Sequence, residues 1–189
     1  MSKTGICSLR EPDKLALHLM IDIETLGRRN DTAITEIGIV AFNPKTALEV
    51  AYTHVRIAPE NWNTCNRTFS GSTLLWWMTI NQKNIVHLKD GVLDYKQALD
   101  RITSFIKKYI SSESRVWAKG PLDLSALKSL YEEFGTPTPW EFWQPRDMRT
   151  LIDLPGWKKI SNNTNAHDAL ADARMQIKEL IENLKKYTK

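Results

Sequence analysis

Three strand-like segments stand close together early in the chain, and they constrain the fold more than any other feature. Each is rich in apolar residues, as buried strands are, and the three cover 17–23, 33–42 and 47–57. Their connections are short, which favours antiparallel pairing between neighbouring strands. The sequence therefore predicts that the chain begins with the antiparallel part of a sheet.

Helical patterns dominate the rest of the chain and alternate with shorter strand-like pieces. Apolar residues at helical spacing predict helices over 72–78, 94–110, 124–134 and 168–187. Short strands are expected over 115–118 and, within a Pro-rich loop, over 141–143. This order predicts an α/β fold in which a mixed five-stranded sheet is flanked by helices.

Length and composition are those of one ordinary globular domain. The chain has 189 residues, of which 42% are hydrophobic and 25% charged, so residues 1–189 are expected to form a single domain. About the first 14 residues are expected to be a poorly ordered lead-in. The net charge of +4 suits a polyanionic partner, but many enzymes of small molecules are equally basic.

Two carboxylates, Asp22 and Glu24, end the first predicted strand. Side chains alternate along a strand, so both point to one face. Adjacent carboxylates repel each other unless a cation lies between them, and Mg²⁺ and Mn²⁺ prefer such oxygen ligands. Chance alone supplies roughly one Asp-x-Glu in a chain of this length. The position is the stronger signal, because acidic residues ending a buried strand are costly without a purpose.

Asp123 follows a Gly120–Pro121 turn, directly after the predicted strand at 115–118. Taken alone, it fits a helix N-cap, where Asp is common, at least as well as a second acidic motif.

A third group, His167 and Asp172, lies at the start of the last predicted helix. Asp172 is close to the apolar stripe, where a carboxylate should be paired or bound to metal. On an ideal helix the two side chains would lie roughly 140° apart. They can share a site only if His167 lies on the preceding loop or in the first turn, with Asn165 as a plausible cap. Taken alone, a histidine here is more often a capping or surface residue.

Taken together, the three groups resemble the DEDDh group of DnaQ-like 3′→5′ exonucleases over about residues 17–185. Asp22 and Glu24 match the first motif and Asp123 the second. His167 and Asp172 match the third, which has the form His-x-Ala-x-x-Asp.

Within this group, the chain is most similar to a small branch that contains phage exonucleases and bacterial exoribonucleases. The segments that carry this similarity are 75–77, 117–121 and 146–151. Many relatives carry Phe before the second-motif Asp, where this chain has Leu122.

The resemblance implies a ribonuclease-H-like fold and hydrolysis assisted by two divalent metal ions, Mg²⁺ or Mn²⁺. The four carboxylates would hold the ions at the terminal phosphodiester. His167 would accept the proton of the attacking water, and the product would be a nucleoside 5′-monophosphate.

Four residues are expected to contact the substrate. The family commonly places contacts to the terminal nucleotide directly after the first motif, at Thr25 and Leu26, although Leu26 could equally pack in the core. Trp77 is expected to stack on a base, but it and Trp76 point about 100° apart on a helix, so at least one should be buried. Arg149 is expected to contact phosphate.

Several charged residues near these motifs have simpler explanations. Asp147 is expected to pair with Arg146 or Arg149 rather than to act as a fifth ligand. Arg28 and Arg29 could bind a phosphate backbone, but an ordinary solvated charge is the better explanation for each.

The resemblance and the residues together predict a 3′→5′ exonuclease acting on nucleic acid 3′ ends. The phage relatives favour DNA, and trimming of RNA is the alternative, because recognition of the 2′-hydroxyl depends on pocket geometry. A catalytically silent nucleic-acid-binding module is disfavoured, since all four acidic positions and the histidine are present. A structural subunit would explain none of these carboxylates.

The expected setting follows from the same features. Relatives are often homodimers, so a homodimer is one arrangement that the resemblance allows. Cys7 and Cys65 form neither a metal pattern nor a disulfide framework. The apolar segment 15–23 is too short to span a membrane. We therefore expect a cytoplasmic protein without a membrane partner, in the host cytoplasm if the chain is phage-encoded.

Overall fold

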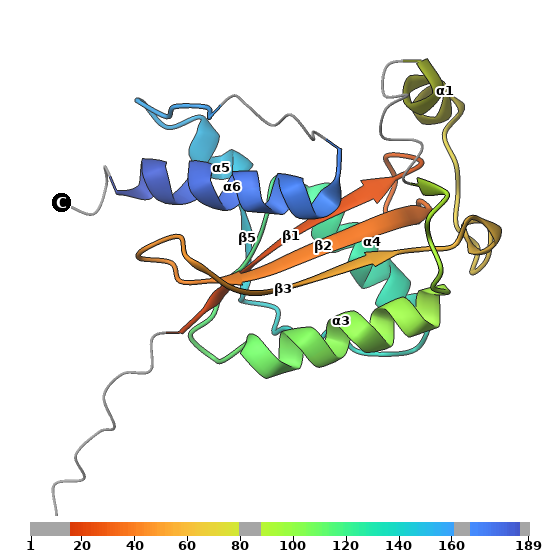
Figure 1. The fold of residues 1–189 in the computed structure, drawn as a ribbon, viewed down its shortest axis with the longest axis horizontal. Coiled ribbons are helices and arrows are strands. Elements are labelled where there is room, and N and C mark those ends of the chain that lie inside the picture. The colour runs from red at the N-terminus through yellow and green to blue at the C-terminus, as the bar shows by residue number, and fades with distance from the viewer. Residues whose placement is uncertain (1–15, 80–87, 161–166, 186–189) are drawn as a thin grey trace, which may run out of the picture.

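The computed structural model describes residues 16–79, 88–160 and 167–185 (Figure 1). Its strands are β1 (His18–Thr25), β2 (Ile34–Phe42), β3 (Glu49–Arg56), β4 (Val116–Ala118) and β5 (Pro145–Asp147). Its helices are α1 (Gly71–Thr79), α3 (Tyr95–Tyr109), α4 (Pro121–Glu133), α5 (Arg149–Ile152) and α6 (Ala169–Leu184), with a 3₁₀ turn at Pro59–Asn61. The expected lead-in, Cys7, Asn165 and the last four residues lie outside the described part.

The strands form one mixed sheet in the order β3-β2-β1-β4-β5. β1, β2 and β3 pair antiparallel, whereas β4 and β5 run parallel to β1. This arrangement confirms the predicted five-stranded mixed sheet and its antiparallel first half. β1 lies at the centre: it pairs with β2 along its length, including Asp22 and Glu24, and with β4 at Leu19 and Met20.

Helices cover both faces of the sheet, and β1 contributes to both layers. Leu19, Ile21 and Ile23 belong to the core cluster shared with α3 and α4, while Met20 packs in the cluster formed with α6. Figure 1 shows α3 and α6 on opposite sides of the strands. Since side chains alternate along a strand, Asp22 and Glu24 share the face of Met20 and point towards α6.

Gly38 on β2 lets the start of α6 approach the sheet closely. A Cβ built at Gly38 would lie 2.5 Å from the Ala169 carbonyl carbon and 2.5 Å from the Leu170 nitrogen. Gly38 is also the ladder partner of Asp22 on β1. The missing side chain therefore brings the first residues of α6 beside the first-motif carboxylates.

Helix α4 begins earlier than predicted, at Pro121 rather than at residue 124. Gly120 is the N-cap, with a φ of 123° that suits glycine, and Pro121 occupies the first helical position, where its missing N–H costs nothing. Asp123 consequently lies within the first turn. The interpretation of Asp123 as the N-cap is therefore wrong.

The last short strand is also displaced from its predicted position. The strand expected at 141–143 is wrong, because β5 begins at Pro145, where the chain pairs with Val116 of β4. Proline is tolerated at the first residue of an edge strand, where no ladder hydrogen bond is lost. Phe142 and Trp143, which belong to the strand expected at 141–143, are instead 89% and 46% exposed.

Asp168 caps helix α6, and its side chain accepts a hydrogen bond from the Ala171 amide at 2.9 Å. The cap proposed from the sequence, Asn165, lies outside the described residues. Within the described ranges, no helix combines the length and the apolar character needed to cross a membrane.

Candidate active site

All five residues of the three motifs line one cavity of about 770 Å³. The cavity opens between the end of β1, the start of α4 and the start of α6. Its lining includes Asp22, Glu24, Asp123, His167 and Asp172.

Asp22 and Glu24 form the β1 side of the cavity. Glu24 is 8% exposed. Asp22 accepts a hydrogen bond from Gln176 Nε2 of α6, with 2.6 Å between donor and acceptor. This bond joins the central strand to the helix that carries the third motif, and it fixes one oxygen of Asp22.

Asp123 enters the cavity from the first turn of α4. Its Oδ1 accepts a hydrogen bond from the Ile23 backbone amide at 3.1 Å, so the carboxylate is tied to the strand segment between Asp22 and Glu24. The positive φ of Gly120 and the early helix start at Pro121 produce this placement.

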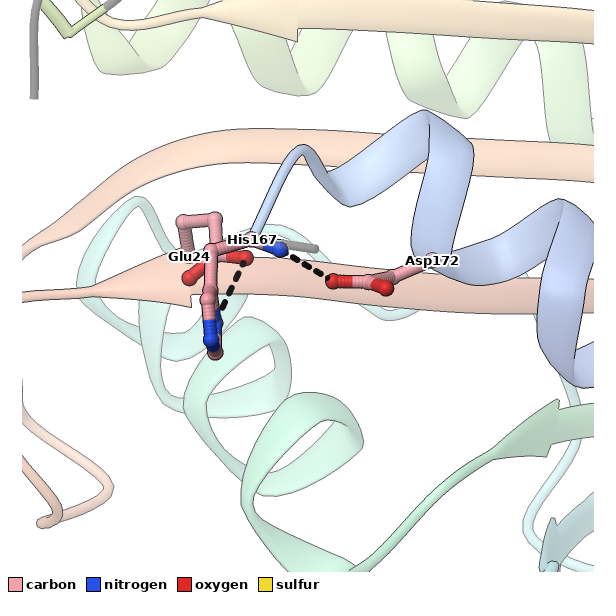
Figure 2. A group of neighbouring side chains, drawn as sticks. All are labelled: Glu24, His167 and Asp172. Atoms are coloured by element: carbon pink, nitrogen blue, oxygen red, sulfur yellow. Dashed lines mark hydrogen bonds and ion pairs between the residues drawn. The ribbon is translucent and has the colours of Figure 1, made fainter. Parts of the chain in front are cut away.

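His167 lies immediately before Asp168, the N-cap of α6. It is therefore on the preceding loop, which is the position that the sequence analysis required for a site shared with Asp172. Its φ is 69°, and its backbone amide donates a hydrogen bond to Asp172 Oδ2 at 2.7 Å. The imidazole then turns towards β1, where Nδ1 lies 4.0 Å from Glu24 Oε1 (Figure 2). His167 and Asp172 therefore share one site because the histidine is outside the helix.

Burial and mutual repulsion make the carboxylates of this cavity difficult to ionise together. Burial raises the pKa of Asp22 well above its ordinary value, and the charges of Asp123, Glu24 and Asp172 raise it further. The pKa of Glu24 is also raised, first by burial and then by Asp172. Burial raises the pKa of Asp123 to about 6, although the hydrogen bond from Ile23 opposes the shift.

The donor set fits a divalent cation. Ligand atoms of Glu24, His167 and Asp172 lie within 4.8 Å of one another, and Asp22 and Asp123 line the same cavity. Carboxylate oxygens are the preferred ligands of Mg²⁺ and Mn²⁺. A cation among them would favour their ionised forms and so oppose the rise in their pKa values, which comes first from burial.

A second, smaller cavity of about 250 Å³ adjoins the first at Glu24. Thr25, Trp76 and Trp77 are among its lining residues. Leu26, in contrast, is 2% exposed and packs in the core with Trp77, which fits the packing alternative for Leu26.

The two tryptophans of α1 have different environments. Trp77 is 1% exposed, and its Nε1 donates a hydrogen bond to the Thr25 carbonyl at 3.0 Å. Trp76 is half-buried, and its ring lies edge-on to the His167 imidazole, with centroids 4.7 Å apart. One of the pair is thus buried, as the helical geometry predicted, and Trp76 is the more accessible ring. Stacking of Trp77 on a base stays a prediction.

Arg149 lines the main cavity from the start of α5. Its guanidinium lies against Gly120, where an added Cβ would come 3.1 Å from Nε. Asp147 accepts a hydrogen bond from the backbone amide of Arg149 at 2.8 Å. This contact is made by the main chain of Arg149, so it is not the charge pair that the sequence predicted, and no such pair is seen among the ion pairs of the described residues.

Two contacts of the site were not predicted from the sequence: the bond of Gln176 to Asp22 and the contact of Trp76 with His167. Gln176 is 5% exposed and lies four residues after Asp172, so both occupy one helical face. The sequence offered one signal for Gln176: a polar amide one turn after a motif carboxylate, beside the apolar stripe of the helix. The contact of Trp76 with His167 had no such signal, because it joins α1 to the start of α6.

Residues 17–183 match the family described as the 3′-5′ exoribonuclease Rv2179c-like domain. The chain belongs to this family. It is a 3′→5′ exonuclease, and the predicted class of enzyme is confirmed.

Individual relatives and solved structures are similar over most of the chain. An exodeoxyribonuclease of Enterobacteria phage T4 is 24% identical over 197 residues, covering 84% of this chain and 85% of the phage protein. The nuclease domain of 3′hExo, a DEDDh family member solved with bound rAMP, gives a TM-score of 0.61 at 14% identity and covers 93% of this chain and 95% of that one. A zinc-bound complex of E. coli exonuclease I with single-stranded DNA gives a TM-score of 0.67 at 14% identity, covering 93% of this chain but only 41% of the exonuclease I chain. These two structural likenesses show a shared ribonuclease-H-like fold.

Proposed function

We propose that the main cavity hydrolyses the terminal phosphodiester of a nucleic acid with the help of two divalent cations, Mg²⁺ or Mn²⁺. The residues that would bind the cations are Asp22, Glu24, Asp123 and Asp172, and the general base would be His167. The observation that carries this proposal is the convergence of four carboxylates and one imidazole, from β1, α4 and the start of α6, on one open cavity.

Divalent cations bound to these carboxylates would lower the pKa of a water molecule and offset the charge on the phosphate and the departing 3′ oxygen. His167 would take the proton released by the attacking water, since its side chain is 42% exposed and faces the cavity beside Glu24. Trp76 would hold the imidazole in this orientation through its edge-on contact. Attack on phosphorus breaks the bond to the 3′ oxygen of the preceding nucleotide, so the product is a nucleoside 5′-monophosphate.

The adjoining smaller cavity would take the terminal nucleoside. It shares Glu24 with the main cavity, so a nucleoside there would place its phosphate among the carboxylates. Thr25 lines it, and Trp76 and Trp77 provide its aromatic side. Arg149, which lines the main cavity, would contact the phosphate oxygens.

DNA is the substrate that we favour, with RNA as the second candidate. The phage relative is an exodeoxyribonuclease and is similar over 84% of this chain. The family description names exoribonuclease activity, which supports the RNA alternative. A homodimer stays a proposal that rests on the sequence resemblance alone.

A direct test incubates the full chain with 5′-labelled DNA and RNA oligonucleotides of the same sequence, with Mn²⁺ or with a chelator. We expect a ladder that shortens from the 3′ end only with metal, nucleoside 5′-monophosphates as products, and faster cleavage of DNA. Faster cleavage of RNA would select the alternative substrate. Absence of metal-dependent cleavage of both polymers would overturn the proposed function.

A further inference from the structure

A second group of charged side chains lies beside the active site, between β2, β3 and the start of α6. It consists of Glu36, His54, Arg56 and Asp168, which we call the Arg56 network. Glu36 on β2 contacts His54 on β3. The Arg56 guanidinium lies 3.5 Å from Glu36 Oε1 and donates a hydrogen bond to Asp168 Oδ2 at 3.1 Å. Arg56 therefore links the sheet to the residue that caps α6.

The network is more buried than an ordinary surface ion pair. The side chain of Glu36 is 1% exposed, and those of Arg56 and Asp168 are 24% and 26% exposed. A buried carboxylate is costly unless it is paired, and Arg56 with His54 supplies the partners of Glu36. Glu36 is also the ladder partner of Glu24, so the network lies one strand away from a carboxylate of the active site.

Asp168 connects this network to His167. Its Oδ1 caps α6 through the Ala171 amide, while its Oδ2 binds Arg56. It directly follows His167, whose φ of 69° is uncommon for a residue with a side chain. Such a conformation persists only where the surroundings fix it. Asp172 fixes the backbone amide of His167, and Arg56 fixes the next residue.

We propose that Arg56 is a positioning residue of the exonuclease reaction. Its guanidinium holds the start of α6 against β2, and this contact sets the direction in which His167 points over Glu24. Arg56 is not among the described residues that line the two cavities of the site. It therefore acts through His167 and not on the substrate. The inference rests on the proposed role of His167 as the base.

A metal ion held by the network is the competing explanation. Ligand atoms of Glu36, His54 and Asp168 also lie within 4.8 Å of one another. However, the cationic guanidinium of Arg56 already bridges the two carboxylates, and it would repel a second cation. The geometry therefore favours Arg56 itself as the positive group at this position.

The test compares kcat and KM of the wild-type chain with those of Arg56→Met, Arg56→Lys and Asp168→Asn, on one oligonucleotide with Mn²⁺. For Arg56→Met we expect kcat to fall about 10- to 100-fold with KM nearly unchanged, because small misplacements of a catalytic group have effects of this size. Arg56→Lys should recover part of the loss. Asp168→Asn keeps a good N-cap but loses the ion pair, so it should also lower kcat, and it carries the test if Arg56→Met does not fold.

Arg174→Met is a matched control, because Arg174 makes a two-bond ion pair between α6 and Glu49 of β3, at 2.8 and 2.9 Å. This variant removes an ion pair between the same two elements, away from His167, and should leave kcat unchanged. In a His167→Ala background, Arg56→Met should change the residual kcat by less than about twofold, since its effect passes through the imidazole.

Two results would overturn the positioning role. One is that the wild type is active and that Arg56→Met and Asp168→Asn have the same kcat as the wild type. The other is an equal loss from Arg56→Met with and without His167. A wild-type chain without any nuclease activity would instead overturn the proposed function, and this inference with it.

Discussion

Gln176 on α6 donates a hydrogen bond to Asp22 on β1, with 2.6 Å between Nε2 and Oδ1. Both residues line the main cavity, and the bond engages one of the two carboxylate oxygens of Asp22. Groups that orient a metal-binding carboxylate in this way commonly affect metal affinity and activity.

We predict that Gln176→Leu weakens metal binding and lowers activity. The loss should be about 10- to 100-fold in Mn²⁺ affinity or in kcat/KM, the range usual for residues that support a metal ligand. Titration calorimetry with Mn²⁺ and nuclease kinetics would measure both effects. Lys178→Ala, on the exposed side of the same helix, is the control and should behave as wild type. Unchanged Mn²⁺ affinity and activity in Gln176→Leu would show that this bond does not support the site.

We predict that Gly38→Ala is both less stable and less active than wild type. The added methyl group would lie 2.5 Å from the backbone of Ala169, so α6 must move away from β2. Crowding of this kind costs about 1–3 kcal/mol in the free energy of unfolding, and the shift would also displace His167 and Asp172. Denaturant unfolding and nuclease kinetics would measure the two effects.

Gly71→Ala provides the comparison for Gly38→Ala. A Cβ at Gly71 meets nothing within 4 Å, so this change should leave stability and activity close to wild type. Equal behaviour of the two variants would mean that the close approach at Gly38 has no consequence.

The carboxylate cluster should make the metal-free chain less stable as pH rises. The folded-state pKa of Asp123 is raised to about 6, and those of Asp22 and Glu24 are also raised. The folded chain then binds more protons than the unfolded chain between pH about 4 and these raised values, so stability falls with increasing pH across this window. Divalent metal should offset the repulsion once the carboxylates are ionised.

Thermal unfolding with Mn²⁺ and with chelator would measure this effect. The rise in Tm caused by Mn²⁺ should be larger at pH 7.5 than at pH 5, and Asp123→Asn should reduce the difference. A Tm that does not respond to Mn²⁺ at pH 7.5 would contradict the assignment of these carboxylates as a metal site.

Much of the fold could be predicted because its signals are local. The helix expected at 94–110 is observed as α3, with Asp94 as its N-cap and Gln97 completing a capping box. The three early strands follow from apolar runs and short connections. β5 was misplaced because its position is set by pairing with β4, and a Pro-rich segment carries little strand signal of its own.

The site was predictable in its residues but not in its geometry. The motifs identified the five side chains, whereas the bond between Gln176 and Asp22 joins residues that are 154 positions apart. It exists only because Gly38 lets α6 approach the sheet. The positive φ of His167 goes with its contact to Asp172 and with the cap at Asp168, whereas the sequence interpretation had named Asn165 as the cap.

The most direct measurement compares wild type with His167→Ala on a 5′-labelled oligonucleotide, with Mn²⁺ affinity measured on the same preparations. If His167 is the base beside four metal-binding carboxylates, turnover should fall by orders of magnitude, about 10²- to 10⁴-fold. Mn²⁺ binding should largely survive. Near-normal turnover in His167→Ala would contradict the account.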